Sequence, residues 1–198
     1  MPVLELTQLR LLNGVAPKDP LLLKALSTVR DALQTQSQFY SCIQDPALIY
    51  ILGLWPNLDA HHEFLASPRA KEILGLQEDM LGFTWTVHVE LDAMTSLPLE
   101  APVMGITRRT VRQGRDDAHI NGLAKERQTL LESSRYKVAS GVRIDAAPGI
   151  HEVVTFTGWE NTQAHDAFTT KLAEVGDPAA TDIYETAQVY LAWNLEGK

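Results

Sequence analysis

A ten-residue segment that occurs twice constrains the fold of this chain more than any other feature. Residues 55–64 read WPNLDAHHEF and residues 159–168 read WENTQAHDAF, so five of ten positions are identical at a spacing of 104 residues. An offset near 100 also places residues 4–7 (LELT) opposite residues 104–107 (MGIT). Because a fixed period marks repeated structural units, we interpret the 198-residue chain as two copies of a unit of about one hundred residues.

Each copy is predicted to run strand, helix, strand, strand, helix, strand, from its apolar spacing and its turn residues. In the first copy the predicted elements are 3–12, 21–34, 39–43, 47–55, 58–76 and 83–92. In the second copy they are 102–113, 118–133, 137–143, 150–159, 162–175 and 185–195. The pair Ser67-Pro68 is expected to interrupt the helix over 58–76.

This element order is the ferredoxin-like arrangement, in which the helices cover one face of the sheet. The other face is apolar and must be buried, which two fused copies achieve by covering each other. We therefore predict an α+β fold class, with a first repeat over 1–95, a second repeat over 102–198 and a linker over 96–101. Together the repeats are expected to form one compact, pseudo-twofold barrel.

Charge and composition exclude several classes of partner. The formal net charge of −8 argues against nucleic acid and against anionic membrane, which both require a basic surface. No apolar run approaches the roughly 20 residues needed to span a bilayer, and the segment after Met1 lacks the features of a signal peptide. Cys42 is the single cysteine and fits a reducing compartment, so a cytoplasmic location is expected.

The repeated motif resembles the dimeric α/β-barrel superfamily, in particular fungal proteins with a tandem antibiotic-biosynthesis-monooxygenase-like (ABM) domain. The resemblance is carried by a strand ending in Gly-Leu-Trp (53–55) or Thr-Gly-Trp (157–159), followed by Asn, Ala-His and Phe. It implies the barrel fold over nearly the whole chain. The relatives include cofactor-free monooxygenases of aromatic polyketides, polyketide cyclases, haem-degrading enzymes, muconolactone-type isomerases and proteins with no assigned activity.

The duplicated motif has a structural and a functional interpretation. Asn57 and Asn161 are good helix N-caps, and the tryptophan before each can pack on the phenylalanine one turn into the helix. Because both copies carry the motif, packing explains it well. His61 and His165, which follow in the first helical turn, remain candidates for contact with a substrate.

Residues without a counterpart in the other copy are better catalytic candidates. His88 lies on a predicted strand, on the opposite face from Trp85, and its imidazole titrates near neutral pH as a general base requires. A histidine with satisfied hydrogen bonds inside the sheet is the alternative. Tyr50 is a candidate donor to a developing oxyanion.

Arginines concentrate on the strand over 102–113. Alternation puts Arg108 and Arg109 on opposite faces, where a guanidinium in a cavity would hold an enolate or carboxylate. Arg109 is therefore predicted to be catalytic and Arg108 to bind substrate, with solvated edge-strand charge as the alternative. The aromatic side chains predicted to line a substrate pocket are Tyr40, Trp85, Tyr190 and Trp193.

No metal-ligand spacing and no glycine-rich nucleotide loop occurs in the sequence, so we expect no cofactor. Haem stays open at this point, because a single histidine suffices as its ligand. The leading hypothesis is a cofactor-independent enzyme that cyclises or isomerises an apolar or aromatic, polyketide-like molecule by acid/base chemistry. A cofactor-free ABM-type monooxygenase is the first alternative, and a non-catalytic small-molecule binding protein is the second. The fusion of two copies leaves further assembly into a homodimer open.

Overall fold

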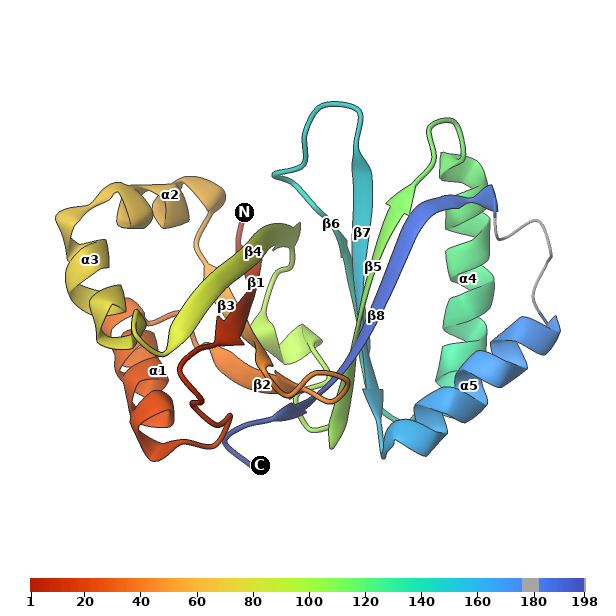
Figure 1. Cartoon of the computed structure of the whole chain (residues 1–198). Coiled ribbons are helices and arrows are strands. Elements are labelled where there is room, and N and C mark those ends of the chain that lie inside the picture. The colour runs from red at the N-terminus through yellow and green to blue at the C-terminus, as the bar shows by residue number, and fades with distance from the viewer. Residues whose placement is uncertain (176–181, 198) are drawn as a thin grey trace. The chain divides into compact units, whose positions relative to one another are not determined.

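The computed structural model describes residues 1–175 and 182–197, and the chain divides into two compact units. Unit 1 contains Met1–Met94 together with the chain from Ala192 onward, and unit 2 contains Thr95–Leu191. Both units combine antiparallel strands with helices and follow the predicted order of strand, helix, strand, strand, helix, strand (Figure 1). Within the described residues, no helix has both the length and the apolar character needed to cross a membrane.

Unit 1 has its helices on one face of an antiparallel sheet (Figure 1). Its sheet order is β4-β1-β3-β2, and Ala192–Asn194 of β8 pair with the free side of β2. The elements are β1 (Val3–Leu11), α1 (Pro20–Leu33), β2 (Gln38–Cys42), β3 (Leu48–Trp55), α2 (Leu58–Ala66), α3 (Pro68–Leu74), the 3-10 turn η1 (Gly75–Gln77), β4 (Leu81–Glu90) and the 3-10 turn η2 (Met94–Ser96), which leads into unit 2.

Unit 2 repeats this plan with two longer helices on one face of its strands (Figure 1). The strand order is β8-β5-β7-β6. The elements are β5 (Val103–Val111), α4 (Asp116–Ser133), β6 (Val138–Val142), β7 (His151–Trp159), α5 (Thr162–Val175) and β8 (Tyr184–Asn194).

Local sequence signals explain where the helices begin and end. Asp19 caps α1 by accepting a hydrogen bond from the backbone N–H of Leu21, and Pro20 occupies the first helical position. The predicted interruption at Ser67-Pro68 is confirmed, because Ser67 is extended, with φ −84° and ψ 151°, as a residue before proline prefers. The single predicted helix over 58–76 is therefore the pair α2 and α3.

Alternation along β1 decides which side chains of unit 1 face the helices. Glu5, Thr7 and Leu9 point to the helix-bearing face, where they line a cavity together with side chains of α1 and α2. The core on that face consists of Leu9, Leu22, Leu26, Phe39, Ile49, Leu81 and Leu195. An acidic and a hydroxyl side chain thus occupy positions that a purely structural strand would fill with apolar residues.

Candidate functional site

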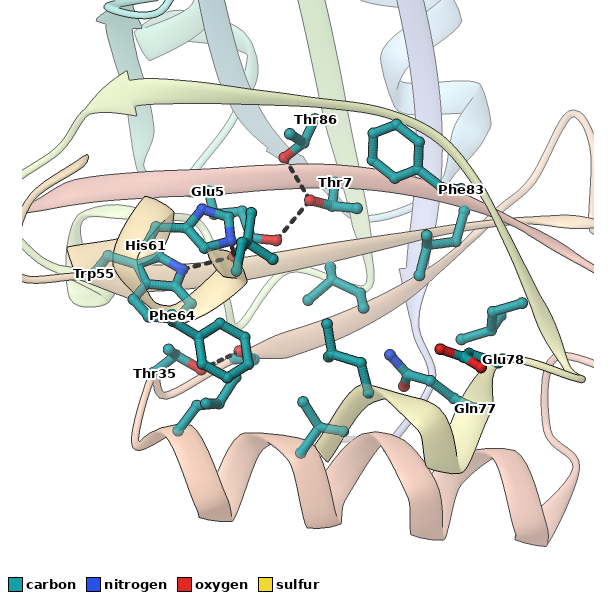
Figure 2. Close-up of a pocket in the computed structure, with 18 residues that line it drawn as sticks. Glu5, Thr7, Thr35, Trp55, His61, Phe64, Gln77, Glu78, Phe83 and Thr86 are labelled. Atoms are coloured by element: carbon teal, nitrogen blue, oxygen red, sulfur yellow. Dashed lines mark hydrogen bonds and ion pairs between the residues drawn. The ribbon is translucent and has the colours of Figure 1, made fainter. Parts of the chain in front are cut away.

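A cavity of about 300 Å³ lies in unit 1 between the sheet and its helices (Figure 2). Its volume is at the lower end of the range for small-molecule sites, roughly 300–1,000 Å³. The apolar side chains around it come from the strands and from α1, α2 and α3; they are Leu9, Val29, Leu33, Ile51, Phe64, Leu65, Leu74, Leu81 and Phe83. Figure 2 shows polar groups at both ends, with Glu5 and His61 at one and Gln77 and Glu78 at the other.

Glu5 is the central polar group of the first end, and its side chain is 15% exposed. Its Oε2 accepts a hydrogen bond of 2.6 Å from Trp55 Nε1, and its Oε1 accepts one of 2.6 Å from Thr7 Oγ1. Thr7 donates its only hydroxyl hydrogen to Glu5, so the 2.6 Å contact between Thr7 and Thr86 must be donated by Thr86. The carboxylate is therefore held by two donors and keeps spare acceptor capacity.

The electrostatic setting of Glu5 is unusual for a buried carboxylate. No lysine or arginine occurs among the residues that line the cavity, although a buried charge is normally paired. The group facing its Oε2 is His61, whose Nε2 lies 3.7 Å away. Two neutral donors and one imidazole thus replace the usual cation.

His61 lies in the first turn of α2 and is only 4% exposed. Its ring stacks on Trp55, with centroids 4.4 Å apart and planes 19° apart. Its Nδ1 is 2.6 Å from Nε2 of His88 on β4. Burial, with the nearby His88 and His62, lowers the pKa of His61 below its ordinary value, while Glu5 opposes this effect.

The charge of Glu5 selects the tautomer of His61. A lone pair on Nε2 would face the carboxylate, so the stable neutral form carries its hydrogen on Nε2 and accepts at Nδ1. His88 is then the donor in the histidine pair. Because both nitrogens of His61 are directed at protein groups, the lone pairs of Glu5 are the better placed acceptors for a proton from a ligand.

Residues on the neighbouring strand and helix explain the position of the Glu5 side chain in the cavity. Glu5 pairs with Gly53 on β3. A Cβ at position 53 would come within 2.9 Å of Ser37 Oγ, which shares a 2.6 Å hydrogen bond with Thr35. Asn57 starts α2 by accepting from the N–H of Ala60, and this places His61 over the strand. The predicted capping role of Asn57 is confirmed.

The structure separates the predicted site residues of unit 1 into two faces. His88 pairs with Glu5 and Trp85 pairs with Gln8, so these two predicted residues do lie on opposite faces of β4. His88 meets His61 behind the cavity wall and is not itself a lining residue.

The predicted tyrosines of unit 1 lie on the face away from the helices. The hydroxyl of Tyr50 accepts from Gln8 Nε2 at 2.9 Å, and its ring is 6.3 Å from that of Trp85. Tyr40 pairs with Tyr50, and burial raises the pKa of Tyr40 to about 12. Neither tyrosine nor Trp85 lines the cavity.

The two predicted arginines lie in unit 2 and form buried ion pairs. Arg108 Nε donates to Glu152 at 2.6 Å, and both terminal nitrogens of Arg109 donate to Glu126 at 2.7 and 2.8 Å. Their side chains are 14% and 15% exposed, and β5 lies between β8 and β7. The alternative interpretation as solvated edge-strand charge is therefore wrong for both arginines. The guanidinium group of Arg109 is already bound to the carboxylate of Glu126.

The remaining predicted residues do not line the cavity. Trp193 is covered by the Lys18 ammonium, 4.4 Å from its ring centroid, and Tyr190 is half-buried near the end of β8. His165 meets the ring of Trp159 edge-on at 5.4 Å and lies 3.3 Å from Asp166.

Sequence reasoning missed Glu5. A signal for it existed, because the alignment of residues 4–7 with 104–107 sets Glu5 against Gly105 and marks a charge present in only one copy. What the alignment could not show is that Trp55, Thr7 and His61 converge on that carboxylate.

No family model matches the chain, and no curated protein is significantly similar to it in sequence. Solved structures are similar in fold. An anthrone oxidase-like protein matches with a TM-score of 0.68 at 12% identity, covering 97% of this chain and 91% of that one. A candidate monooxygenase from Lactobacillus acidophilus matches with a TM-score of 0.58 at 14% identity, covering 98% and 93%.

A haem-binding protein from Thermus thermophilus matches with a TM-score of 0.57 at 12% identity, covering 98% of this chain and 90% of that one. The chain therefore has the α+β fold of the dimeric α/β-barrel type, as predicted. At these identities the similarity establishes the fold and leaves the reaction to the site itself.

Haem fits the cavity of unit 1 poorly. Its lining includes two carboxylates, Glu5 and Glu78, and no lysine or arginine that could pair with propionates. The lining histidine, His61, has one ring nitrogen against His88 and the other directed at Glu5, so neither is placed as an axial ligand. A compact, apolar molecule without negative charge suits these walls better.

Proposed function

We propose that unit 1 is the catalytic half of an enzyme that removes a proton from an acidic C–H group of a small, apolar, aromatic molecule. Glu5 is the base. The observation that carries this proposal is a carboxylate that has no cationic partner among the lining residues, at one end of a cavity whose walls are largely apolar. A carboxylate in this position can take a proton directly from a molecule bound against the apolar walls.

The neighbours of Glu5 have positioning roles in this reaction. Trp55 and Thr7 each hold one carboxylate oxygen and fix the direction of the remaining lone pairs. His61 directs its Nε2 toward Glu5, and His88 fixes the ring of His61 from behind. His88, which was expected to be the base, acts here through His61.

Oxygenation is the reaction that we favour after proton removal. The carbanion R₂CH⁻ transfers electrons to dissolved O₂ and forms the peroxide R₂CHOO⁻, which takes the proton from Glu5. Loss of water then yields the ketone, so R₂CH₂ and O₂ become R₂C=O and H₂O, with carbon oxidised and oxygen reduced. The substrate is its own reductant in this scheme. The shared fold with an anthrone oxidase-like protein and a candidate monooxygenase supports this choice.

Cyclisation or isomerisation is the second candidate, and it begins with the same proton transfer. After that step Glu5 is a carboxylic acid beside Thr7 and Trp55, within reach of the bound molecule. Returning the proton to another carbon would complete an isomerisation without oxygen. A free, buried Cys42 agrees with a reducing, cytoplasmic setting for either reaction.

Two measurements with anthrone as the probe test the proposal. Under nitrogen in D₂O, the enzyme should exchange the methylene hydrogens of anthrone, as followed by NMR. Glu5→Gln should slow this exchange about 100-fold or more, since it removes the base. Glu63→Gln is the matched control, because Glu63 is exposed on α2 and does not line the cavity. In air, the wild type should consume O₂ and place one atom of ¹⁸O₂ in the ketone.

The outcomes separate the alternatives. Exchange without O₂ consumption would favour the isomerase over the oxygenase. Exchange that survives in Glu5→Gln, or that never exceeds the rate without enzyme, would contradict the assignment of Glu5.

A further inference from the structure

Two hydroxyl groups line the cavity in the segment that joins α1 to β2, and they belong to Thr35 and Ser37. Figure 2 shows Thr35 at the same end of the cavity as Glu5. The residues that alternate with them, Gln34 and Gln36, are exposed and have left-handed backbones, with φ of 57° and 54°. Such a backbone is uncommon for residues other than glycine. In this conformation Thr35 and Ser37 are both buried against the cavity, at 4% and 6% exposure.

Gly53 allows these hydroxyls to approach Glu5. Glu5 and Gly53 are paired across β1 and β3, and the side chains of such a pair leave the same face of the sheet with Cβ atoms about 5 Å apart. A Cβ at position 53 would lie 2.9 Å from Ser37 Oγ and 3.7 Å from Thr35 Oγ1. The Ser37 hydroxyl therefore occupies the place of the side chain that would neighbour Glu5 across the strands.

The hydroxyl pair keeps one hydrogen for a ligand. Thr35 Oγ1 and Ser37 Oγ are 2.6 Å apart, so one of them donates to the other. A hydroxyl group has one hydrogen and two lone pairs, so the group that accepts retains its own hydrogen. Glu5 does not use this hydrogen, because its carboxylate accepts from Trp55 and Thr7. No other hydrogen bond of either hydroxyl occurs within the described part of the chain.

We propose that Ser37 is a further catalytic residue, whose hydroxyl donates a hydrogen bond to the enolate oxygen that forms when Glu5 removes a proton. Thr35 is a positioning residue, which donates to Ser37 Oγ and strengthens it as a donor. The inference rests on the proposed function for one element, Glu5 as the base.

The step balances without another reactant. Glu5 takes the proton, the electron pair of the C–H bond forms a C=C bond, and the carbonyl electron pair moves onto oxygen. The proton of Ser37 stays on Ser37. A donor placed where negative charge develops stabilises the transition state more than the bound substrate, so it accelerates proton removal.

The closeness of base and donor also restricts the substrate. Because Ser37 neighbours Glu5 across the strands, the oxygen that gains charge belongs to a carbonyl group directly bonded to the carbon that loses its proton. The substrate class is therefore a ketone or ester that reacts at its α-carbon. In anthrone the carbonyl oxygen lies across the ring from the reacting methylene group, so Ser37 contributes little to its exchange.

Two ketones with different spacing test the assignment. Hydrogen exchange would be followed by NMR under nitrogen in D₂O, with 2-indanone as the α-carbon probe and anthrone as the comparison. Ser37→Ala should slow exchange of 2-indanone at least tenfold and exchange of anthrone no more than twofold. General damage to the cavity would slow both probes alike. Thr35→Val should slow exchange of 2-indanone about threefold, and Thr35→Ser, which retains the hydroxyl, should keep the wild-type rate.

Binding tests the donor without turnover. Indane has the shape of 2-indanone and lacks the carbonyl oxygen, and the affinities of the full chain for both would be measured by NMR titration. The preference for the ketone should fall about fivefold in Ser37→Ala, as expected for one neutral hydrogen bond, with indane binding unchanged. Gln36→Asn is the control, because Gln36 is exposed, does not line the cavity and has a backbone that asparagine tolerates. It should match the wild type in both assays.

Equal slowing of the two probes by Ser37→Ala, or an unchanged preference for the ketone, would overturn the assignment of Ser37. Failure of the proposed function gives a different result, in which neither probe exchanges faster than it does without enzyme. If the preference for the ketone still depends on Ser37 in that case, the hydroxyl stands as a carbonyl-binding group in a cavity without this chemistry. If exchange depends on Glu5 while neither assay responds to Ser37→Ala, the base stands and the donor falls.

Discussion

The two units use the same motif, and one of the pairs of facing strand positions that differ between them lies beside its tryptophan. In unit 1, Glu5 on β1 faces Gly53 on β3, whereas in unit 2 Gly105 faces Thr157. Trp55 ends β3 and donates its Nε1–H to Glu5 at 2.6 Å. In unit 2, Trp159 ends β7 and donates its Nε1–H to Thr157 Oγ1 at 2.8 Å.

The histidines of the motif also make different contacts in the two units. His61 stacks on its tryptophan and faces a carboxylate, while His165 meets its tryptophan edge-on and lies near Asp166. The asparagine caps and the tryptophan–phenylalanine contacts are kept in both units. The shared part of the motif therefore builds the fold, and the exchanged pair decides which unit places a carboxylate beside the tryptophan and histidine of the motif.

Moving the carboxylate into unit 2 should have the largest effect on stability. A Cβ at Gly105 would lie 2.4 Å from Thr157 Oγ1 and 3.1 Å from Trp159 Nε1. Gly105→Glu should therefore lower the free energy of unfolding by about 3 kcal/mol, through overpacking and a poorly solvated charge. Adding Thr157→Gly recreates the arrangement of unit 1 and should restore at least half of the loss. Urea unfolding measures both.

Gly75→Ala is the control for this experiment, because a Cβ there meets nothing within 4 Å and the backbone is helical. It should leave stability unchanged or raise it slightly. Full stability of Gly105→Glu alone would show that Thr157 does not close the site in unit 2.

Removing the indole donor should affect the two units in different ways. Trp55→Phe deprives the Glu5 carboxylate of a charge-assisted donor, so we expect anthrone exchange to fall about tenfold. Trp159→Phe leaves only the Thr157 hydroxyl unpaired and should cost about 1 kcal/mol of stability with exchange unchanged. Anthrone exchange rates and urea unfolding curves of both variants provide the test. An equal loss of exchange in the two variants would contradict a catalytic role that is confined to unit 1.

Buried histidines make both units sensitive to acid. Burial lowers the pKa of His61 in unit 1 and of His119 in unit 2 below the ordinary 6.5. Below that pH the unfolded chain binds protons that the folded chain does not, so stability is lost as pH falls through the window beneath 6.5. Urea unfolding at pH 7.5 and pH 5 should show this loss, and it should shrink in the double variant His61→Gln/His119→Gln. An undiminished loss would point to other groups.

Element order and helix starts could be predicted from the sequence because they depend on local signals. Asn57, Asn161 and Asp19 cap the predicted helices, and proline explains the interruption at Ser67. Such signals act over a few residues and can be recognised in the sequence without a structure.

The candidate site depends on strand register, which local signals do not provide. His88 reaches His61 only because β4 pairs with β1, and Trp55 reaches Glu5 because β3 pairs on the other side. The fork of Arg109 is occupied by Glu126, a helical partner 17 residues away. Gln77 lies in η1, one residue beyond the helix end that the sequence predicted at 76.

The smallest expected effect tests the shared part of the motif. Asn57→Ala and Asn161→Ala each remove the acceptor of one helix N–H, from Ala60 and Ala164 respectively, and should each cost about 1 kcal/mol of stability. Only Asn57→Ala should also slow anthrone exchange, by about twofold, because α2 positions His61 beside Glu5 and a frayed first turn loosens that contact. Asn57→Asp keeps the cap and should restore both quantities. Equal slowing by the two alanine variants would mean that the catalytic asymmetry does not follow from the exchange of Glu5 and Gly105.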